Sequence, residues 1–261
     1  SPSSGTFDSF VRISSNDPVV KGYNTDYRPL QFDENTAPGF TRAYRLSNIP
    51  LVTDPDWAGT YREFQLDINQ TSGNAIYSLD QVEIYLTDCP FISDYPFADW
   101  ATAGTACNKN VSYDYADLVY KLDKVGQEPT GQNSIKLNYN LAGGSGKRDM
   151  ILRVPNANFL GSTLGADPAC AYAGEPPAGS ACNTWVVLYS QFGEDIAGLA
   201  GNDDGYEEWG VELYNLASKS GTKFEDLDAD GVKDAGEPGL PDWTIYVDYN
   251  GNGAFDLGEP S

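Results

Sequence analysis

Residues 63–68 read Glu-Phe-Gln-Leu-Asp-Ile, and residues 82–87 read Val-Glu-Ile-Tyr-Leu-Thr. In both stretches an apolar side chain stands at every second position. A β-strand turns successive side chains to opposite faces, so this period of two predicts strands with one face in a core and the other in water. The same period recurs at residues 135–141 and at residues 208–213, around Trp209.

Other candidate strands are shorter, and they lie at residues 7–13, 43–46, 118–122, 150–154 and 185–189. No stretch has apolar residues at helical spacing over the length of a helix. Residues 143–146 read Gly-Gly-Ser-Gly, which predicts a hairpin between the strands on either side. About ten strands with irregular loops predict an all-β fold, an antiparallel β-sandwich for which a jelly roll is equally allowed.

Composition and charge exclude several classes of function. The chain has 261 residues, a formal net charge of −22 and no histidine. Phosphate would be repelled, so neither nucleic acid nor an anionic lipid surface is expected as a partner. The missing histidine removes Ser-His-Asp and Cys-His catalysis and histidine-ligated zinc. The chain also has no GxSxG, P-loop or dinucleotide-binding motif, so we predict that it is not an enzyme and has no catalytic residues.

Two further readings of individual side chains remain open. A pair of carboxylates could cleave glycosides, and the obvious acidic pair is Glu207 with Glu208. Neighbours on a strand point to opposite faces, so we expect both to be solvated strand residues instead. In a carbohydrate-binding module, Trp57, Trp100 or Trp185 would stack on sugar rings, although tryptophan more often packs in a core or loop.

The four cysteines are Cys89, Cys107, Cys170 and Cys182. None belongs to a CxxC motif, so a zinc site is not expected. Each close pair brackets a stretch rich in Gly, Pro, Ala and Asp. Among the alternative connectivities we favour the sequential bridges Cys89–Cys107 and Cys170–Cys182. Both bridges would need an oxidising compartment, which predicts a secreted or cell-surface protein.

Weaker signals point to the same location. The opening Ser-Pro-Ser-Ser-Gly is typical of a mature N-terminus after removal of a signal peptide. Residues 69–71 (Asn-Gln-Thr) and 110–112 (Asn-Val-Ser) match the acceptor motif for N-glycosylation. No run of about 18 apolar residues exists, so no insertion into a membrane is expected.

Residues 226–237 fit every position of the twelve-residue EF-hand calcium loop, reading Asp-Leu-Asp-Ala-Asp-Gly-Val-Lys-Asp-Ala-Gly-Glu. Calcium prefers oxygen ligands, and this spacing brings carboxylates and one carbonyl around a single point. Gly231 stands where the loop must turn sharply. The candidate ligands are Asp226, Asp228, Asp230, the carbonyl of Val232, Asp234 and Glu237.

Residues 248–259 fit the same template, reading Asp-Tyr-Asn-Gly-Asn-Gly-Ala-Phe-Asp-Leu-Gly-Glu. The candidate ligands are Asp248, Asn250, Asn252, the carbonyl of Ala254, Asp256 and Glu259. We therefore predict two Ca²⁺ sites. The first loop places five carboxylates around the ion and the second places three with two asparagines, so we expect the first to bind more tightly.

The residues that flank these loops do not favour helices. Pro238 and Gly239 follow the first loop and Pro260 follows the second, and neither residue type favours continuing a helix. Residues 243–247 (Trp-Thr-Ile-Tyr-Val) indicate a strand between the loops. Calcium loops between strands argue against a calmodulin-like sensor and against a dockerin, because in both of these the loops lead into helices.

Residues 221–248 read Gly-Thr-Lys-Phe-Glu-Asp-Leu-Asp-Ala-Asp-Gly-Val-Lys-Asp-Ala-Gly-Glu-Pro-Gly-Leu-Pro-Asp-Trp-Thr-Ile-Tyr-Val-Asp. This stretch resembles the opening of the B-type (Cna-B-like) repeats of serine–aspartate-repeat surface adhesins. The resemblance covers residues 221–261 and implies a calcium-stabilised β-module of a rigid stalk, with the side chains named above as ligands. Residues 1–216 resemble, only loosely, domains of uncharacterised secreted microbial proteins, and no activity follows from that.

These observations predict a β-sandwich domain at residues 1–216, a linker at 217–223 and a calcium-binding segment at 224–261. The segment would be an incomplete B-type repeat, because about two strands cannot close a sandwich. The expected function is that of a non-enzymatic, secreted or cell-surface calcium-binding protein, a fibre, surface-layer or adhesin-stalk subunit. Its expected partners are other copies of itself, adjoining domains of a longer surface protein, or glycans.

Overall fold

The computed structural model describes residues 7–54, 56–102, 104, 106–123, 133–141, 148–166, 183–194, 205–212 and 223–241. The chain divides into two units, Ser1–Tyr214 and Asn215–Ser261, which are considered separately below as unit 1 and unit 2. No helix in the described ranges is long and apolar enough to cross a membrane. The predicted strand at residues 243–247 lies outside the described residues.

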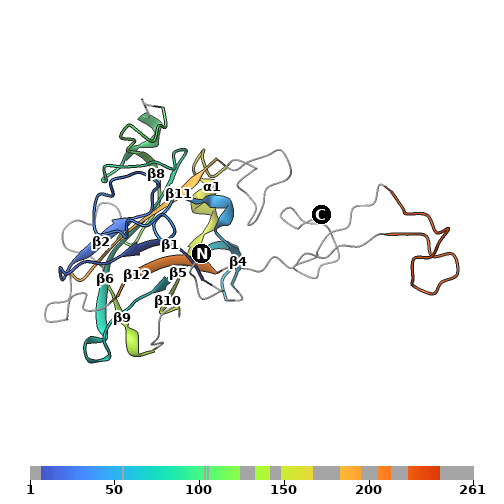
Figure 1. Cartoon of the computed structure of the whole chain (residues 1–261), viewed down its shortest axis with the longest axis horizontal. Helices are drawn as coiled ribbons and strands as arrows, with labels where there is room; N and C mark the ends of the chain where they lie inside the picture. The colour runs from blue at the N-terminus through green and yellow to red at the C-terminus, as the bar shows by residue number, and fades with distance from the viewer. Residues whose placement is uncertain are drawn as a thin grey trace. The chain divides into compact units, whose positions relative to one another are not determined.

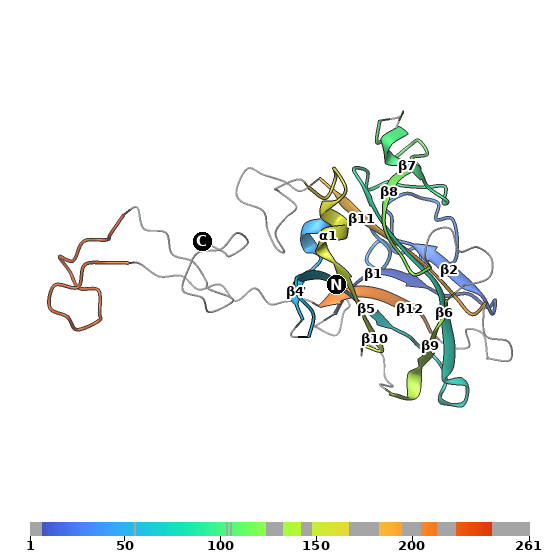
Figure 2. The ribbon, with the colours of Figure 1, turned by 180° about the vertical axis from the view of Figure 1, so that it is seen from behind.

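Unit 1 is all-β, and its described strands form two sheets (Figures 1 and 2). The five-stranded sheet has the order β1-β12-β5-β10, and β4 also pairs with β5. All of its pairs are antiparallel. The strands are β1 (Phe7–Ile13), β4 (Leu51–Thr53), β5 (Thr60–Asp67), β10 (Met150–Pro155) and β12 (Glu207–Glu212).

The seven-stranded sheet has the order β2-β11-β6-β8-β7, with β3 pairing to β11 and β9 to β6. Only β7 and β8 run parallel among the described pairs. The strands are β2 (Val20–Tyr23), β3 (Tyr44–Arg45), β6 (Ile76–Thr87), β7 (Ala98–Asp99), β8 (Tyr115–Lys121), β9 (Ile135–Asn138) and β11 (Trp185–Phe192). One short α-helix, α1 (Asn156–Leu160), and four 3₁₀ turns (Leu46–Asn48, Ser72–Asn74, Trp100–Thr102 and Tyr139–Leu141) complete the described elements.

The period of two located most of these strands, and all of the predicted strands within the described residues are confirmed in whole or part. The strand expected at 135–141 ends at Asn138, where a 3₁₀ turn begins. The predicted hairpin at residues 143–146 is wrong. β9 pairs with β6 and β10 pairs with β5, so the two strands belong to different sheets. Each of them pairs with a longer strand instead of with its neighbour in sequence.

One apolar core takes side chains from both sheets. Phe64 and Leu66 of β5 belong to the same buried cluster as Ile84 of β6 and Leu188 of β11. Trp209 of β12 is fully buried in this cluster, and its Nε1–H donates a hydrogen bond to Ser190 Oγ of β11 at 3.1 Å. The two sheets therefore share one core, and Trp209 also joins them by a polar contact.

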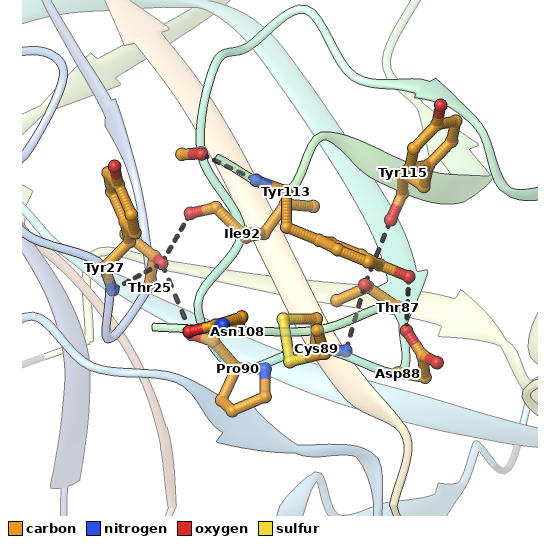
Figure 3. The surroundings of a disulfide bond; sticks show 12 residues. Thr25, Tyr27, Thr87, Asp88, Cys89, Pro90, Ile92, Asn108, Tyr113 and Tyr115 are labelled. Carbon is orange, nitrogen blue, oxygen red and sulfur yellow. Dashed lines mark hydrogen bonds between the residues drawn. A yellow bond between two sulfur atoms is a disulfide. The ribbon is translucent and has the colours of Figure 1, made fainter. Parts of the chain in front are cut away.

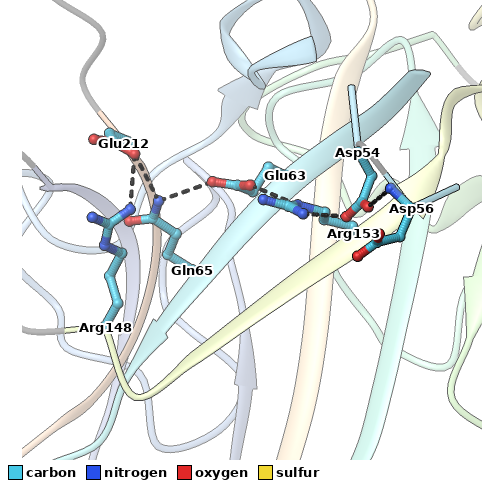
Figure 4. A network of polar contacts seen from close by, with 7 residues as sticks. All are labelled: Asp54, Asp56, Glu63, Gln65, Arg148, Arg153 and Glu212. Atoms are coloured by element: carbon cyan, nitrogen blue, oxygen red, sulfur yellow. Dashed lines mark hydrogen bonds and ion pairs between the residues drawn. The ribbon is translucent and has the colours of Figure 1, made fainter. Parts of the chain in front are cut away.

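The opposite face of β5 is not in water, which corrects the expectation from the alternating pattern. Glu63, Gln65 and Asp67 are only 4%, 1% and 3% exposed. Arg153 of β10 pairs through Nε with Glu63 Oε2 at 2.9 Å, and Gln65 Nε2 donates to Glu63 Oε1 at 3.2 Å. Figure 4 shows this network of polar contacts across neighbouring strands, which lets charged side chains lie on a covered face.

The opposite face of β6 and β11 is also covered, but by aromatic side chains. Tyr85 and Tyr189 project from these strands into a second buried cluster. Loop residues Tyr95 and Phe97 pack on them, and the Tyr95 and Tyr189 rings stack with centroids 3.9 Å apart. The alternating pattern could not reveal this layer, because the rings that cover the strand come from loops.

The predicted Cys89–Cys107 disulfide is confirmed, and Figure 3 shows its surroundings. The bridge closes the loop that carries Tyr95 and Phe97. Beside it, Cys89 N–H donates to Thr87 Oγ1 at 3.2 Å, and the Tyr113 hydroxyl donates to Asp88 Oδ1 at 2.6 Å. The bridge therefore fastens both ends of the loop next to the end of β6. The other predicted bridge, Cys170–Cys182, lies outside the described residues.

Candidate functional site

The described part of unit 2 is a closed loop on a short antiparallel stem (Figure 1, orange-red). Phe224 and Gly239 form an antiparallel bridge. Glu225 N–H donates to the Pro238 carbonyl at 3.0 Å, and Leu240 N–H donates to the Lys223 carbonyl at 2.9 Å. Residues 226–237 therefore lie between two extended segments, and residues 223–241 contain no helix.

Inside the loop, aspartate side chains hold the backbone in a tight turn. Asp226 Oδ2 accepts a hydrogen bond from Gly231 N–H at 2.9 Å, and Asp230 Oδ1 accepts one from Val232 N–H at 2.7 Å. Gly231 has a φ of +80°, a left-handed conformation that glycine adopts without steric cost. The sharp turn thus falls at the glycine where the calcium-loop template requires it.

Glu237 connects the two ends of the loop. It is largely buried, and its Oε1 accepts a hydrogen bond from Leu227 N–H at 2.8 Å. Its Oε2 accepts one from Asp234 N–H at 2.9 Å, while the Lys233 ammonium donates to the Glu237 carbonyl at 2.9 Å. Each carboxylate oxygen has a second lone pair, so these bonds leave Glu237 able to bind a cation.

The five acidic side chains of the loop gather in two overlapping groups. One group is Asp226, Asp228 and Glu237, and the other is Asp228, Asp230 and Asp234; in each, the oxygen atoms lie within 4.8 Å of one another. Hydrogen bonds from the backbone, chiefly from Gly231 N–H, hold the pKa of Asp226 below its usual range. Hard, charged oxygen donors at this spacing fit Ca²⁺ rather than a thiophilic metal.

The second predicted loop lies outside the described residues, as do its candidate ligands. These are Asp248, Asn250, Asn252, Ala254, Asp256 and Glu259.

The acidic pair of β12 is placed differently from the expectation. Glu207 is 0% exposed and Glu208 is 8% exposed, so the prediction that both are solvated is wrong. β12 runs between β1 and β5, and its side chains at residues 207–211 are buried on both faces of the sheet. Glu207 Oε2 accepts a hydrogen bond from Asn69 N–H at 3.0 Å, whereas Glu208 pairs with Arg12 Nε at 2.6 Å.

Burial raises the pKa of Glu207 well above the usual range of glutamic acid, and the charges of Asp67 and Asp149 raise it further. The fold therefore favours the neutral acid. Stability from that form is fully present below the pKa of the unfolded chain and is lost as pH rises through the raised pKa. We expect Glu207→Gln to increase the free energy of unfolding at neutral pH and to flatten its pH dependence, measured by urea unfolding between about pH 4 and pH 8.

A suitable control is Glu208→Gln, which makes the same change one residue along. It removes the charge that pairs with Arg12 and is therefore expected to lower stability at neutral pH. In Glu207→Gln, the new amide can donate to Gln70 Oε1, a buried atom that has no hydrogen-bond partner among the described residues, once the Gln70 amide rotates by half a turn. A pH profile unchanged by Glu207→Gln would contradict the assignment of a neutral acid.

The three candidate tryptophans differ in exposure. Trp57 is 65% exposed. Trp100 is partly buried against the second aromatic cluster, and Trp185 is partly buried with the Arg45 guanidinium 4.4 Å from its ring centre. Of these three, Trp57 is therefore the one whose ring is freely available to a ligand.

Comparisons with known proteins add no assignment: no family model, curated protein or solved structure matched the chain. The resemblance of residues 221–261 to an adhesin repeat consequently stays a prediction from the residues quoted above.

Proposed function

We propose that this chain is a non-enzymatic, calcium-binding structural protein of the cell exterior, serving as a subunit of a fibre, a surface layer or an adhesin stalk. In this proposal, unit 1 is a jelly-roll-like β-sandwich, and unit 2 carries two EF-hand-like loops that bind Ca²⁺ between strands. The observation that carries the proposal is the gathering of five carboxylates in one loop at the spacing of a calcium site.

The physical role of calcium follows from the charges of the loop. Asp226, Asp228, Asp230, Asp234 and Glu237 repel one another at these distances, and Lys233 is the only basic side chain among the twelve residues. A divalent cation reverses this repulsion and draws the side chains to one point. Because Glu237 binds both ends of the loop, its coordination would make the stem rigid as well.

An exterior location agrees with the Cys89–Cys107 disulfide, which persists in oxidising surroundings. The net charge of −22 also suits a protein that works among divalent cations. We propose other copies of the chain, or adjoining domains of a longer surface protein, as partners.

Calorimetric titration of the full chain with Ca²⁺ is expected to show binding that Glu237→Gln weakens by about tenfold or more at the first loop, because one ligand loses its charge and its bidentate grip. The matched control is Glu225→Gln, which removes the same charge from the same segment but outside the twelve positions. Equal losses in both variants, or no heat of binding in the unmodified chain, would refute the calcium site.

The structural role is tested by assembly. Sedimentation velocity in millimolar calcium is expected to show large species that dissolve when a chelator is added. A monomer under both conditions would rule out a self-assembling fibre or surface-layer subunit. The remaining proposal would then be a stalk segment of a longer surface protein. In either case, calcium at about 100 times its dissociation constant should stabilise the segment that binds it by about 2.7 kcal/mol. Equal protease sensitivity of residues 226–261 with and without calcium would contradict that stabilisation.

A further inference from the structure

Hydrogen bonds on both sides of Trp57 hold the backbone between β4 and β5. Asp54 Oδ1 accepts a hydrogen bond from Asp56 N–H at 2.9 Å, and the Asp54 carbonyl accepts a longer one from Trp57 N–H at 3.4 Å. On the other side of the turn, the Tyr61 hydroxyl donates to the Ala58 carbonyl at 3.0 Å. Hydrogen bonds thus tie the described residues of this turn to Asp54, which follows β4, and to Tyr61 of β5.

The Trp57 ring remains largely in water although an apolar neighbour lies close. Its centre is 6.3 Å from that of Tyr61, with the planes tilted by 56°. At 65% exposure, it forgoes much of the stabilisation that burying a large ring provides. Core packing therefore does not explain why this turn presents a tryptophan.

Fixed charges lie on the same face of β5 as Tyr61, the side chain next to the Trp57 ring, because Glu63 is two residues from Tyr61 on this strand. Asp54 Oδ2 pairs with Arg153 Nη1 at 2.5 Å, and Arg153 Nε pairs with Glu63 Oε2 at 2.9 Å (Figure 4). The Arg153 side chain is 34% exposed and that of Asp54 is 17% exposed, so both can meet solvent. Because Arg153 is held from two sides, its remaining N–H groups are oriented in advance for an additional acceptor.

We propose that Trp57, Asp54 and Arg153 form a carbohydrate-binding site for a neutral polysaccharide of glucose or N-acetylglucosamine. Such pyranoses carry their hydroxyl groups around the rim and leave apolar C–H faces that can lie on an indole ring. The rim hydroxyls can donate to the Asp54 carboxylate and accept from the Arg153 guanidinium. A net charge of −22 opposes acidic polysaccharides, so the ligand is neutral.

This inference is independent of the calcium proposal, because it concerns unit 1 and the calcium loop belongs to unit 2. The test is affinity electrophoresis of the full chain in native gels that contain hydroxyethyl cellulose, laminarin or glycol chitin. We expect at least one of these polymers to retard the protein. Trp57→Ala should raise the dissociation constant for that polymer, obtained from the retardation, by about tenfold or more. Alginate, which is anionic, is expected not to retard it.

Two further variants sharpen the result. Trp57→Phe keeps a smaller ring and should retain part of the retardation, while Trp100→Ala should leave it unchanged in protein that remains folded by circular dichroism. No retardation by any of the three neutral polymers would overturn the proposal. So would equal retardation of Trp57→Ala, or self-association that Trp57→Ala abolishes, since the ring would then contact a second copy of the chain.

Discussion

Replacing Trp209 by alanine is expected to lower the free energy of unfolding of the chain by about 4 kcal/mol. Trp209 is fully buried in the core that the two sheets share, so the substitution leaves a large void between them. It also removes the indole N–H that bonds to Ser190 on the opposite sheet, leaving a buried hydroxyl without this donor. Urea unfolding followed by far-ultraviolet circular dichroism measures the change.

The same substitution at Trp57 is the matched control. Trp57 is 65% exposed, so Trp57→Ala is expected to change the free energy of unfolding by less than about 1 kcal/mol. Similar losses at both positions would mean that Trp209 does not join the sheets as described. Trp209→Phe should fall between the two, because it keeps most of the buried volume but loses the hydrogen bond.

Removing the Cys89–Cys107 disulfide is expected to cost about 3 kcal/mol. The bridge closes a loop across a sequence separation of 18, which restricts the unfolded chain, and the loop carries rings that cover β6 and β11. The double variant Cys89→Ala/Cys107→Ala should therefore unfold at lower urea concentration. Its near-ultraviolet circular dichroism should weaken as well, because Tyr95 and Phe97 lose their fixed packing on Tyr85 and Tyr189.

A reductant supplies the control for this experiment. Reduced unmodified protein should match the double variant if Cys89–Cys107 accounts for the whole effect. Any further loss that reductant causes in the double variant reports on the other predicted bridge, Cys170–Cys182. Unchanged stability of both the double variant and the reduced protein would contradict the role given to the Cys89–Cys107 bridge.

Local pattern was sufficient to find most strands of unit 1. The alternation at residues 63–68 and 82–87 lies in β5 and β6, the strands on which the two sheets are built, and residues 7–13 form β1 as expected. β2, β4 and β7 were not predicted, because none of these short strands shows a clear period of two. The pattern could not show that β9 and β10 join different sheets, since strand pairing depends on residues distant in sequence.

The sequence could not predict the burial of charged residues either. Glu63 and Glu207 look like surface positions in a list of residues, yet Glu63 is paired with Arg153, some 90 residues away, and Glu207 is held by Asn69 and Gln70, well over 100 residues away. No local signal marks them, because an acidic residue in an alternating strand has the same pattern whether its face is covered or in water. Only the tertiary structure shows that side chains on both faces of β5 and β12 are buried.

By itself, the sequence determined the all-β class of unit 1 and the set of carboxylates that share the loop at residues 226–237, and it favoured the pairing of Cys89 with Cys107. These features depend on side-chain alternation or on residues close along the chain, where backbone geometry limits the choices. Tertiary structure alone decided which sheet each strand joins, which charges are buried and which tryptophan meets solvent. Those outcomes depend on contacts between distant segments, and their free energies become decisive only once the two sheets have packed.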